Sequence, residues 1–221
     1  MAALLAIDFG FIIVNIAAVL AAKAHVIAAV PEMLKVTHDL ALPEDFNYVK
    51  WAVIAAALIW LSIRDRWLPP LLWAVVFLMI LADDSLQFHE TLGHAMSTAL
   101  DLPSNAMLYG DDLGEVAVFG IMGLIALGLG IAAFSQSGRA SRVLGLRYCI
   151  VIAGLGFFGV GIDTAHQIIV HLLNGTWFDT VLQQIAGMLE DGGEMVVGSL
   201  ALALTLAADP IRPDDTPEPS V

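Results

Sequence analysis

Acidic and histidine side chains recur inside the long apolar stretches of this sequence, where an uncompensated charge is costly and each ionisable residue is a candidate functional residue. The densest run, residues 83 to 94, reads Asp-Asp-Ser-Leu-Gln-Phe-His-Glu-Thr-Leu-Gly-His. On a continuous helix successive residues lie about 100° apart, so residues three, four or seven positions apart share a face. This spacing predicts a polar seam along one narrow stripe, formed by Asp83, Gln87, Glu90 and His94.

Three later apolar stretches also contribute carboxylate or imidazole groups: Glu115, the pair Asp163 and His166, and the pair Glu190 and Glu194. Carboxylate oxygens and imidazole nitrogens are ligands that suit iron, manganese and zinc. We therefore predict a transition-metal site, with a candidate catalytic proton donor or further ligand, His94, beside it. The predicted ligand pool is Glu90, Glu115, Asp163, His166, Glu190 and Glu194.

Two simpler interpretations compete with a metal site. The stripe around Glu90 would also serve as an interhelical hydrogen-bond seam, and Asp163 with His166 would also form an ordinary ion pair. The overall pattern resembles that of di-iron carboxylate bundles, in which two helices supply Glu-x-x-His and two supply a single Glu. Here only one acid-x-x-His occurs, and it begins with Asp163, so no ligand role is carried over from those bundles.

The elements that must hold these residues in place are long apolar helices. Hydrophobic residues make up 59% of the chain and charged residues only 14%, whereas a soluble domain carries about 25% charged residues. Apolar stretches of about 20 residues cross a bilayer as helices, because the backbone groups must be paired within the segment. The sequence predicts an all-α integral membrane protein, a single domain over 1–208, with about six transmembrane helices at 3–24, 48–64, 70–95, 112–134, 146–173 and 183–207.

Arginine placement predicts the orientation of these spans. Arg64 and Arg66 lie between the second and third spans, Arg139 and Arg142 between the fourth and fifth, and Arg212 after the sixth. Positive residues mark cytoplasmic segments, so both termini should lie in the cytoplasm, as expected for a protein of a bacterial cytoplasmic membrane. In that orientation the acids of spans three to six share the outer half of the bilayer, which predicts a four-helix bundle with a polar core.

The tail, the first loop and the ends of the spans are interpreted from their composition. The acidic, proline-rich tail 209–221 should be disordered in the cytoplasm, because it has little to bury. The loop between the first two spans contains Lys35 and Lys50, and His38 within it should be solvated. Several tryptophans fall near span ends, where aromatic rings favour the membrane interface: Trp51, Trp67, Trp73 and Trp177.

Charge excludes one class of partner and leaves three functions open. A net charge of −13 argues against nucleic acid, which needs a basic surface. The first function is a metalloprotein in the lipid bilayer, with redox or hydrolytic chemistry on a lipid or quinone-like molecule. The second is a proton- or cation-coupled transporter or channel. The third is an accessory subunit of a larger membrane complex, or a homo-oligomer, whose helices pack closely through glycines such as Gly110 and Gly114.

Overall fold

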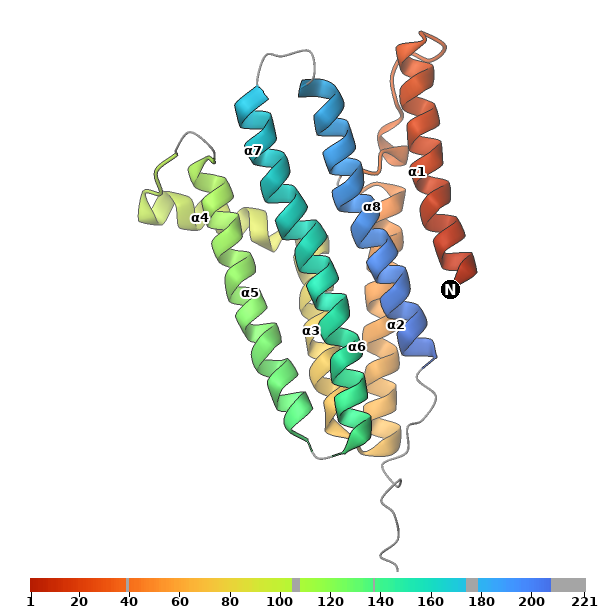
Figure 1. The fold of residues 1–221 in the computed structure, drawn as a ribbon, viewed down its shortest axis with the longest axis vertical. Coiled ribbons are helices and arrows are strands. Elements are labelled where there is room, and N and C mark those ends of the chain that lie inside the picture. Colours follow the sequence, from red (N-terminus) through yellow and green to blue (C-terminus); the bar gives the residue numbers. More distant parts are fainter. Residues whose placement is uncertain (39, 105–107, 137, 174–178, 208–221) are drawn as a thin grey trace, which may run out of the picture.

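The computed structural model describes residues 1–38, 40–104, 108–136, 138–173 and 179–207, and within these ranges the chain is helical with no strand. The tail 209–221 and Trp177 lie outside the described residues. Figure 1 shows a bundle of long helices with a shorter one, α4, running across it. The elements are α1 (Ala2–Lys23), η1 (Glu32–Leu34), α2 (Leu42–Asp65), α3 (Leu68–Leu86), α4 (Phe88–Leu100), α5 (Gly110–Ser135), α6 (Arg139–Leu155), η2 (Gly156–Ile162), α7 (Asp163–Leu173) and α8 (Asp179–Leu206).

Five segments are long and apolar enough to cross a membrane: α1, α2, α3, α5, and the continuous rod formed by α6, η2 and part of α7, Arg139–Ile169. They correspond to the first five spans expected from the sequence, so the all-helical fold is confirmed. The sixth expected span, 183–207, is the helix α8, but it is not among the five. Three acids, Glu190, Asp191 and Glu194, lie in the middle of this helix.

The third expected span, 70–95, is not one helix. The helix α3 ends at Leu86, and Gln87 adopts the left-handed conformation with φ 51°. The Asp83 carboxylate then accepts hydrogen bonds from the backbone N–H and the ring Nδ1 of His89, at 2.9 and 3.0 Å, and so pairs polar groups of the first turn of α4. The stripe predicted on a continuous helix therefore does not exist, because Asp83 belongs to α3 whereas Glu90 and His94 belong to α4.

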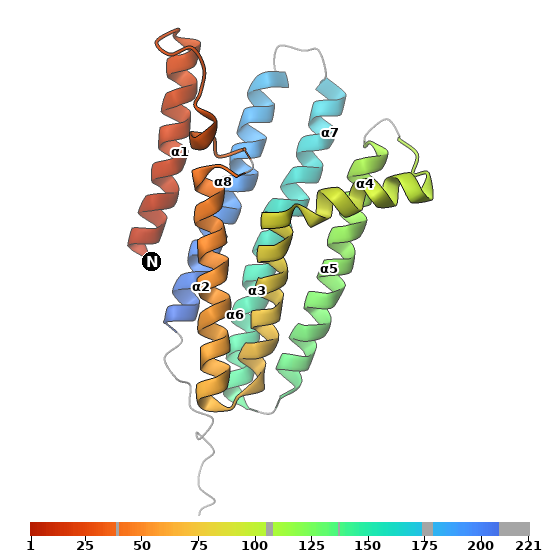
Figure 2. The ribbon, with the colours of Figure 1, turned by 180° about the vertical axis from the view of Figure 1, so that it is seen from behind.

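The bundle also includes the second span, which the sequence-based bundle of spans three to six left out. The helix α2 packs against α3 and α8 (Figure 2), and it shares one hydrophobic core with α3, α6 and α8. Trp51 and Trp73 lie in that core, 1% and 2% exposed, so the prediction that these two rings anchor the chain at an interface was wrong. Along α2 and α8 the core begins at Trp51 and Val197, which lie seven and three residues after the nearest cavity acids on those helices, Glu44 and Glu194.

The first helix docks on the bundle through its polar residues. The buried residues of α1 are Asp8 and Asn15, which lie seven positions apart and therefore on one face of the helix. Many apolar side chains of α1 are exposed, and Ile13, for example, is 64% exposed. Asp8 pairs with Lys50 of α2 at 3.1 Å, and both side chains are almost fully buried. Lys50 also donates to the Met195 carbonyl of α8 at 2.7 Å. The lysine that the sequence analysis counted with a loop is thus the buried centre of the contact between α1, α2 and α8.

A π-helical segment, η2, joins α6 to α7 and contains three glycines. Two close approaches to α8 explain why this region needs small residues. A Cβ added at Gly159 would clash with the carboxylate of Glu194, and one added at Gly193 would clash with the ring of Phe158. The segment η2 therefore lies directly against the part of α8 that carries the acids, immediately before Asp163.

Candidate functional site

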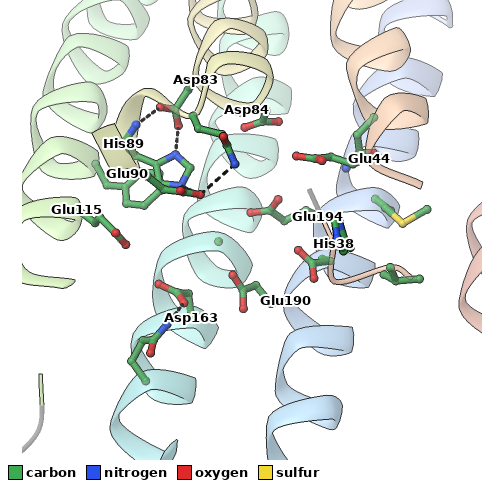
Figure 3. A pocket seen from close by; sticks show the side chains of 18 residues that line it. His38, Glu44, Asp83, Asp84, His89, Glu90, Glu115, Asp163, Glu190 and Glu194 are labelled. Carbon is green, nitrogen blue, oxygen red and sulfur yellow. Dashed lines mark hydrogen bonds and ion pairs between the residues drawn. The ribbon is translucent and has the colours of Figure 1, made fainter. Parts of the chain in front are cut away.

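The upper half of the bundle encloses a cavity of about 360 Å³. Its walls come from α2, the end of α3, the start of α4, α5, η2, α7 and α8, together with two residues of the segment before α2, and Figure 3 shows acidic side chains from several of these elements extending into it. Along the bundle axis it lies on the side away from the α2–α3 and α5–α6 turns, which meet at the lower end in Figure 1. Arg64, Arg66, Arg139 and Arg142 lie at or beside those two turns.

The cavity is lined by an excess of negative groups. Nine of the 22 acidic residues of the chain line it, together with two histidines and, among the described residues, no lysine or arginine. Carboxylates that line one cavity raise the cost of ionising one another, so this lining favours a bound cation. The nine are Glu44, Asp83, Asp84, Glu90, Glu115, Asp163, Glu190, Asp191 and Glu194.

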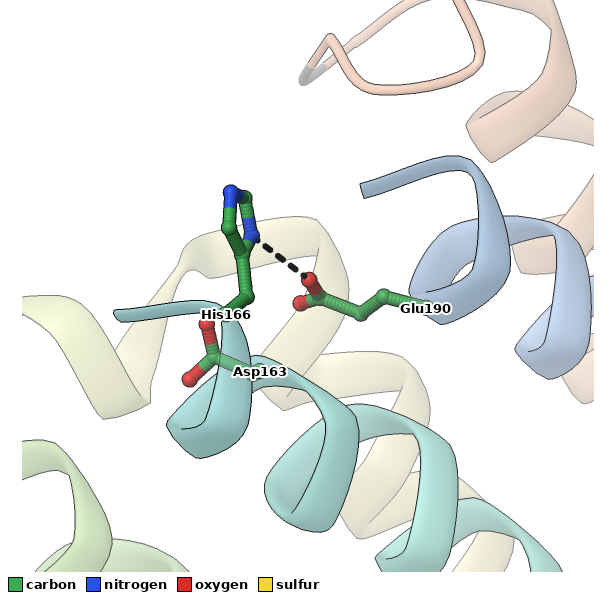
Figure 4. Close-up of side chains that lie close together, drawn as sticks. All are labelled: Asp163, His166 and Glu190. Carbon is green, nitrogen blue, oxygen red and sulfur yellow. Dashed lines mark ion pairs between the residues drawn. The ribbon is translucent and has the colours of Figure 1, made fainter. Parts of the chain in front are cut away.

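Asp163 and Glu190 of this wall form a compact group of possible metal ligands together with His166, which does not itself line the cavity. One ligand atom from each lies within 4.8 Å of the others, and all three side chains are half-buried. The ring Nδ1 of His166 lies 3.7 Å from a carboxylate oxygen of Glu190 (Figure 4). Asp163 and His166 lie on the first turn of α7 and Glu190 lies on α8, so the group joins two neighbouring helices.

The other predicted ligands and the two seam residues, Asp83 and Gln87, lie on the same cavity but outside this group. Glu115 comes from α5 and Glu194 from α8, whereas Glu90 comes from α4 and is 48% exposed. His94, the predicted proton donor, does not line the cavity. Its side chain is 72% exposed and its Nδ1 lies 3.2 Å from Asp111 at the start of α5. The structure therefore offers His94 no position beside the group of three.

Several cavity residues were missed in the sequence analysis. Asp84 is not on the predicted stripe, yet it lines the cavity and accepts a hydrogen bond from the Trp51 indole at 2.9 Å. His89 is not on that stripe either, but the helix break at Gln87 turns it back toward Asp83. His38 is 45% exposed, as expected, but it also lines the cavity and pairs with Glu32 at 2.8 Å. The spacing of these residues gave no signal, because their positions depend on the break and on a loop.

The surroundings of His89 favour the positively charged form of its imidazole ring. Burial by itself would lower the pKa of His89, but the hydrogen bond and the negative charge of Asp83 outweigh burial, helped by Glu90 and Glu115. The pKa consequently lies above its ordinary value of 6.5. The ring also stacks on Phe119 with 4.7 Å between ring centroids. His89 is therefore held as a partner of Asp83, which leaves its role in ligand binding secondary.

Two further polar groups at this site have no hydrogen-bond donor among the described residues. The Asn47 side chain lines the cavity, is 6% exposed, and its Oδ1 has no hydrogen-bond donor within the part of the chain that the structure describes. The Glu194 carboxylate likewise has no hydrogen-bond donor among those residues. Both groups can accept hydrogen bonds, so a molecule bound in the cavity could donate to them.

Comparison with known proteins gives a family and no relative of known function. A family model described as "Domain of unknown function (DUF8692)" matches residues 11–209, which include every helix except the first part of α1. No curated protein and no solved structure shows significant similarity to the chain. The cavity and its residues are therefore the basis on which a function can be argued.

Proposed function

We propose that the protein is a membrane metalloprotein that binds a transition-metal ion through Asp163, His166 and Glu190. The chain belongs to the family DUF8692, whose description assigns no function, so the proposal is argued from the cavity. The observation that supports this best is that one ligand atom from each residue lies within 4.8 Å of the others, while two of the three residues, Asp163 and Glu190, line the acidic cavity. Two carboxylates and one imidazole suit iron, manganese or zinc. Three protein ligands leave a coordination position for water or substrate.

The surrounding charge favours a cation strongly. Two unit charges 4 Å apart interact by roughly 4 kcal/mol at the effective dielectric constant of a protein near its surface. A divalent ion among the carboxylates replaces several repulsions of this size with attractions. When bound, the metal would supply Lewis-acid or redox chemistry to a membrane-soluble substrate that enters the cavity. The other acids would then hold the substrate or accept protons from it.

We propose that the chain crosses the membrane six times, with α8 as the sixth span. Five segments already have the length and apolarity to cross, and they expose large apolar side chains such as Leu124, Ile131 and Ile13, each at least 60% exposed. The acids of α8 line the cavity and so need not face lipid. The arginines of the α2–α3 and α5–α6 turns favour a cytoplasmic position for that end.

The orientation predicts the result of a reporter experiment. A reporter fused after Val221 should be active in the cytoplasm, and one inserted after Asn174, between α7 and α8, should be active outside, because arginine-rich turns are retained in the cytoplasm. Measured activities of paired reporters that work on opposite sides of the membrane test this directly. The reverse pattern at both positions would invert the orientation and open the cavity to the cytoplasm.

The metal site is tested by a pair of histidine variants. His166→Ala should weaken the binding of zinc or manganese by at least about tenfold, because loss of even an indirect partner of a metal costs 10- to 100-fold in affinity. His94→Ala should leave the affinity unchanged, since His94 lies outside the cavity beside Asp111. Isothermal titration of the purified, metal-stripped protein measures both affinities. Wild-type protein that binds no metal in the micromolar range, or equal losses in both variants, contradicts the proposal.

One observation favours a second function, proton- or cation-coupled transport. Nine carboxylates are more than a single metal ion needs, and chains of acids and histidines inside a bundle also relay protons and ions. Metal-dependent flux into liposomes that contain the purified protein would support transport. A bound stoichiometric metal without flux would support the metalloprotein.

A further inference from the structure

An apolar cavity of about 140 Å³ adjoins the acidic one. The two share five wall residues, of which three are carboxylates: Asp83, Asp84 and Glu194, with Phe119 and Gly159. Its remaining walls are mainly apolar and come from α2, α3, α5, α6 and η2, for example Met79, Met122 and Leu155. The acidic cavity therefore continues sideways into the apolar part of the bundle.

The apolar space extends further along the helices. A third cavity of about 570 Å³ shares Gly123, Ala126 and Ile152 with the second and reaches Phe134 near the end of α5. From Phe119 to Phe134 the helix rises about 22 Å, at about 1.5 Å per residue. That distance exceeds half of a hydrocarbon layer about 30 Å thick. Together the second and third cavities form one groove, which we name the α5–α6 groove, long enough for an extended hydrocarbon chain.

The groove is built for a small molecule that reaches it from the lipid. A volume of several hundred Å³ lies in the range of small-molecule sites. The outer wall is made by residues that are themselves exposed, including Leu127 and Ile131 of α5, so the groove is open along its side. Gly123 and Gly130 of α5 keep the groove wide, because neither places a side chain into it.

The upper end of the groove selects a particular kind of head group. Asp84 already accepts one hydrogen bond, from Trp51, but Glu194 and the nearby Asn47 Oδ1 have no donor among the described residues. A head group that donates hydrogen bonds satisfies these acceptors, and a positive one is also attracted by the carboxylates. A phosphate or carboxylate head would be repelled by the same groups.

We propose that the α5–α6 groove binds the hydrocarbon chain of a single-chain membrane amphiphile whose small head, a hydroxyl or an ammonium group, donates hydrogen bonds into the acidic cavity. This inference rests on the proposed function in one respect: the head group of the bound amphiphile is the part of the ligand that would contact the metal. It identifies the substrate class as a long-chain alcohol or amine, and it excludes fatty acids and phospholipids as preferred ligands.

The chain contains one cysteine, and its position allows a direct test. Cys149 of α6 is exposed and lines the lower part of the groove, so a bound chain should shield it. The rate of alkylation by N-ethylmaleimide is measured on the full-length protein in nanodiscs with hexadecanol, hexadecylamine or hexadecanoic acid as the probe. At a probe concentration about ten times its Kd, mass action predicts about tenfold protection. Hexadecanol and hexadecylamine should protect, and hexadecanoic acid should protect far less.

Two glycines of α5 supply a matched pair of variants. A Cβ added at Gly123 or at Gly128 would meet nothing within 4 Å, so both positions tolerate a larger side chain, but only Gly123 lines the groove. Gly123→Leu should abolish the protection of Cys149, whereas Gly128→Leu should leave it intact. Ile152→Phe, which fills the same part of the groove from α6, provides a second variant.

The outcomes separate the two proposals. Equal protection by all three probes, or protection that survives both Gly123→Leu and Ile152→Phe, overturns the groove assignment. Metal binding by Gly123→Leu, measured without any probe, should equal that of the wild type and also shows that the variant is folded. If the wild type binds no metal but Cys149 is protected selectively, the proposed function fails while the groove assignment stands.

Discussion

Asp8→Leu should lower the free energy of unfolding by about 3–5 kcal/mol, because it leaves the Lys50 ammonium buried without its counter-ion. Lys50 and Asp8 are 1% and 0% exposed, and their charged atoms lie 3.1 Å apart. Without Asp8, Lys50 would keep neutral partners among the described residues: the Met195 carbonyl at 2.7 Å, the Ser199 hydroxyl at 3.4 Å and the Phe46 ring at 4.7 Å. The unfolding free energy is measured by denaturant titration in mixed micelles, monitored through tryptophan fluorescence.

The double variant Asp8→Leu with Lys50→Met is the control for this prediction. It replaces both charges with apolar groups of similar size, and replacement of a whole buried ion pair is often neutral or stabilising. The double variant should therefore recover most of the lost stability. If the double variant is as unstable as Asp8→Leu, the loss comes from packing of α1 and not from an unpaired charge. The pair then contributes little to the fold.

The double variant Asp163→Asn with Glu190→Gln should weaken metal binding by roughly 100-fold or more, because each lost ligand alone costs at least about tenfold. The same variant should raise the thermal midpoint of the metal-free protein. Nine carboxylates line the cavity, so removing two negative charges lowers the repulsion between those that remain. Isothermal titration measures the affinity, and scanning calorimetry of the metal-stripped protein measures the midpoint.

A matched double variant controls for charge alone. Glu32→Gln with Asp111→Asn removes the same two charges from exposed positions outside the cavity. It should change neither metal affinity nor the midpoint appreciably, since exposed pairs contribute about 0–1 kcal/mol. The result that contradicts the metal site is a lower midpoint for Asp163→Asn with Glu190→Gln at unchanged affinity. Glu190 would then serve only as a structural partner of His166.

The long helices that form the bundle were predictable because their apolar stretches are long and their ends are marked by polar residues. The break at Gln87 was not predictable from residue type. Neither glycine nor proline occurs between Asp83 and His89, and the break is accompanied by a tertiary contact, the hydrogen bonds from His89 to Asp83. That break decides which residues of the run face the cavity. As a result, His89 lines the cavity, whereas His94 does not.

The pair Asp8 and Lys50 was missed although the sequence contains a signal for it. Asp8 and Asn15 are the polar side chains within an apolar run that extends from Ala2 to Ala22, and they lie seven positions apart. Two polar residues on one face of a membrane helix indicate a contact with protein. Lys50 was counted with the loop between the first two spans, whereas it lies well inside α2, which begins at Leu42, six residues before the expected span.

The π-helical segment before Asp163 makes the candidate metal site depend on how many residues the chain contains there, and not only on which residues they are. A π-helical turn holds more residues than an α-helical turn, and such turns are frequent at functional sites. Loss of one residue between Gly156 and Ile162 would keep every acid and histidine, yet it would rotate all that follows by about 100° around the helix axis. Asp163 and His166 would then turn away from Glu190. Relatives of this chain that share the site should therefore preserve the length of this segment even where its residues differ.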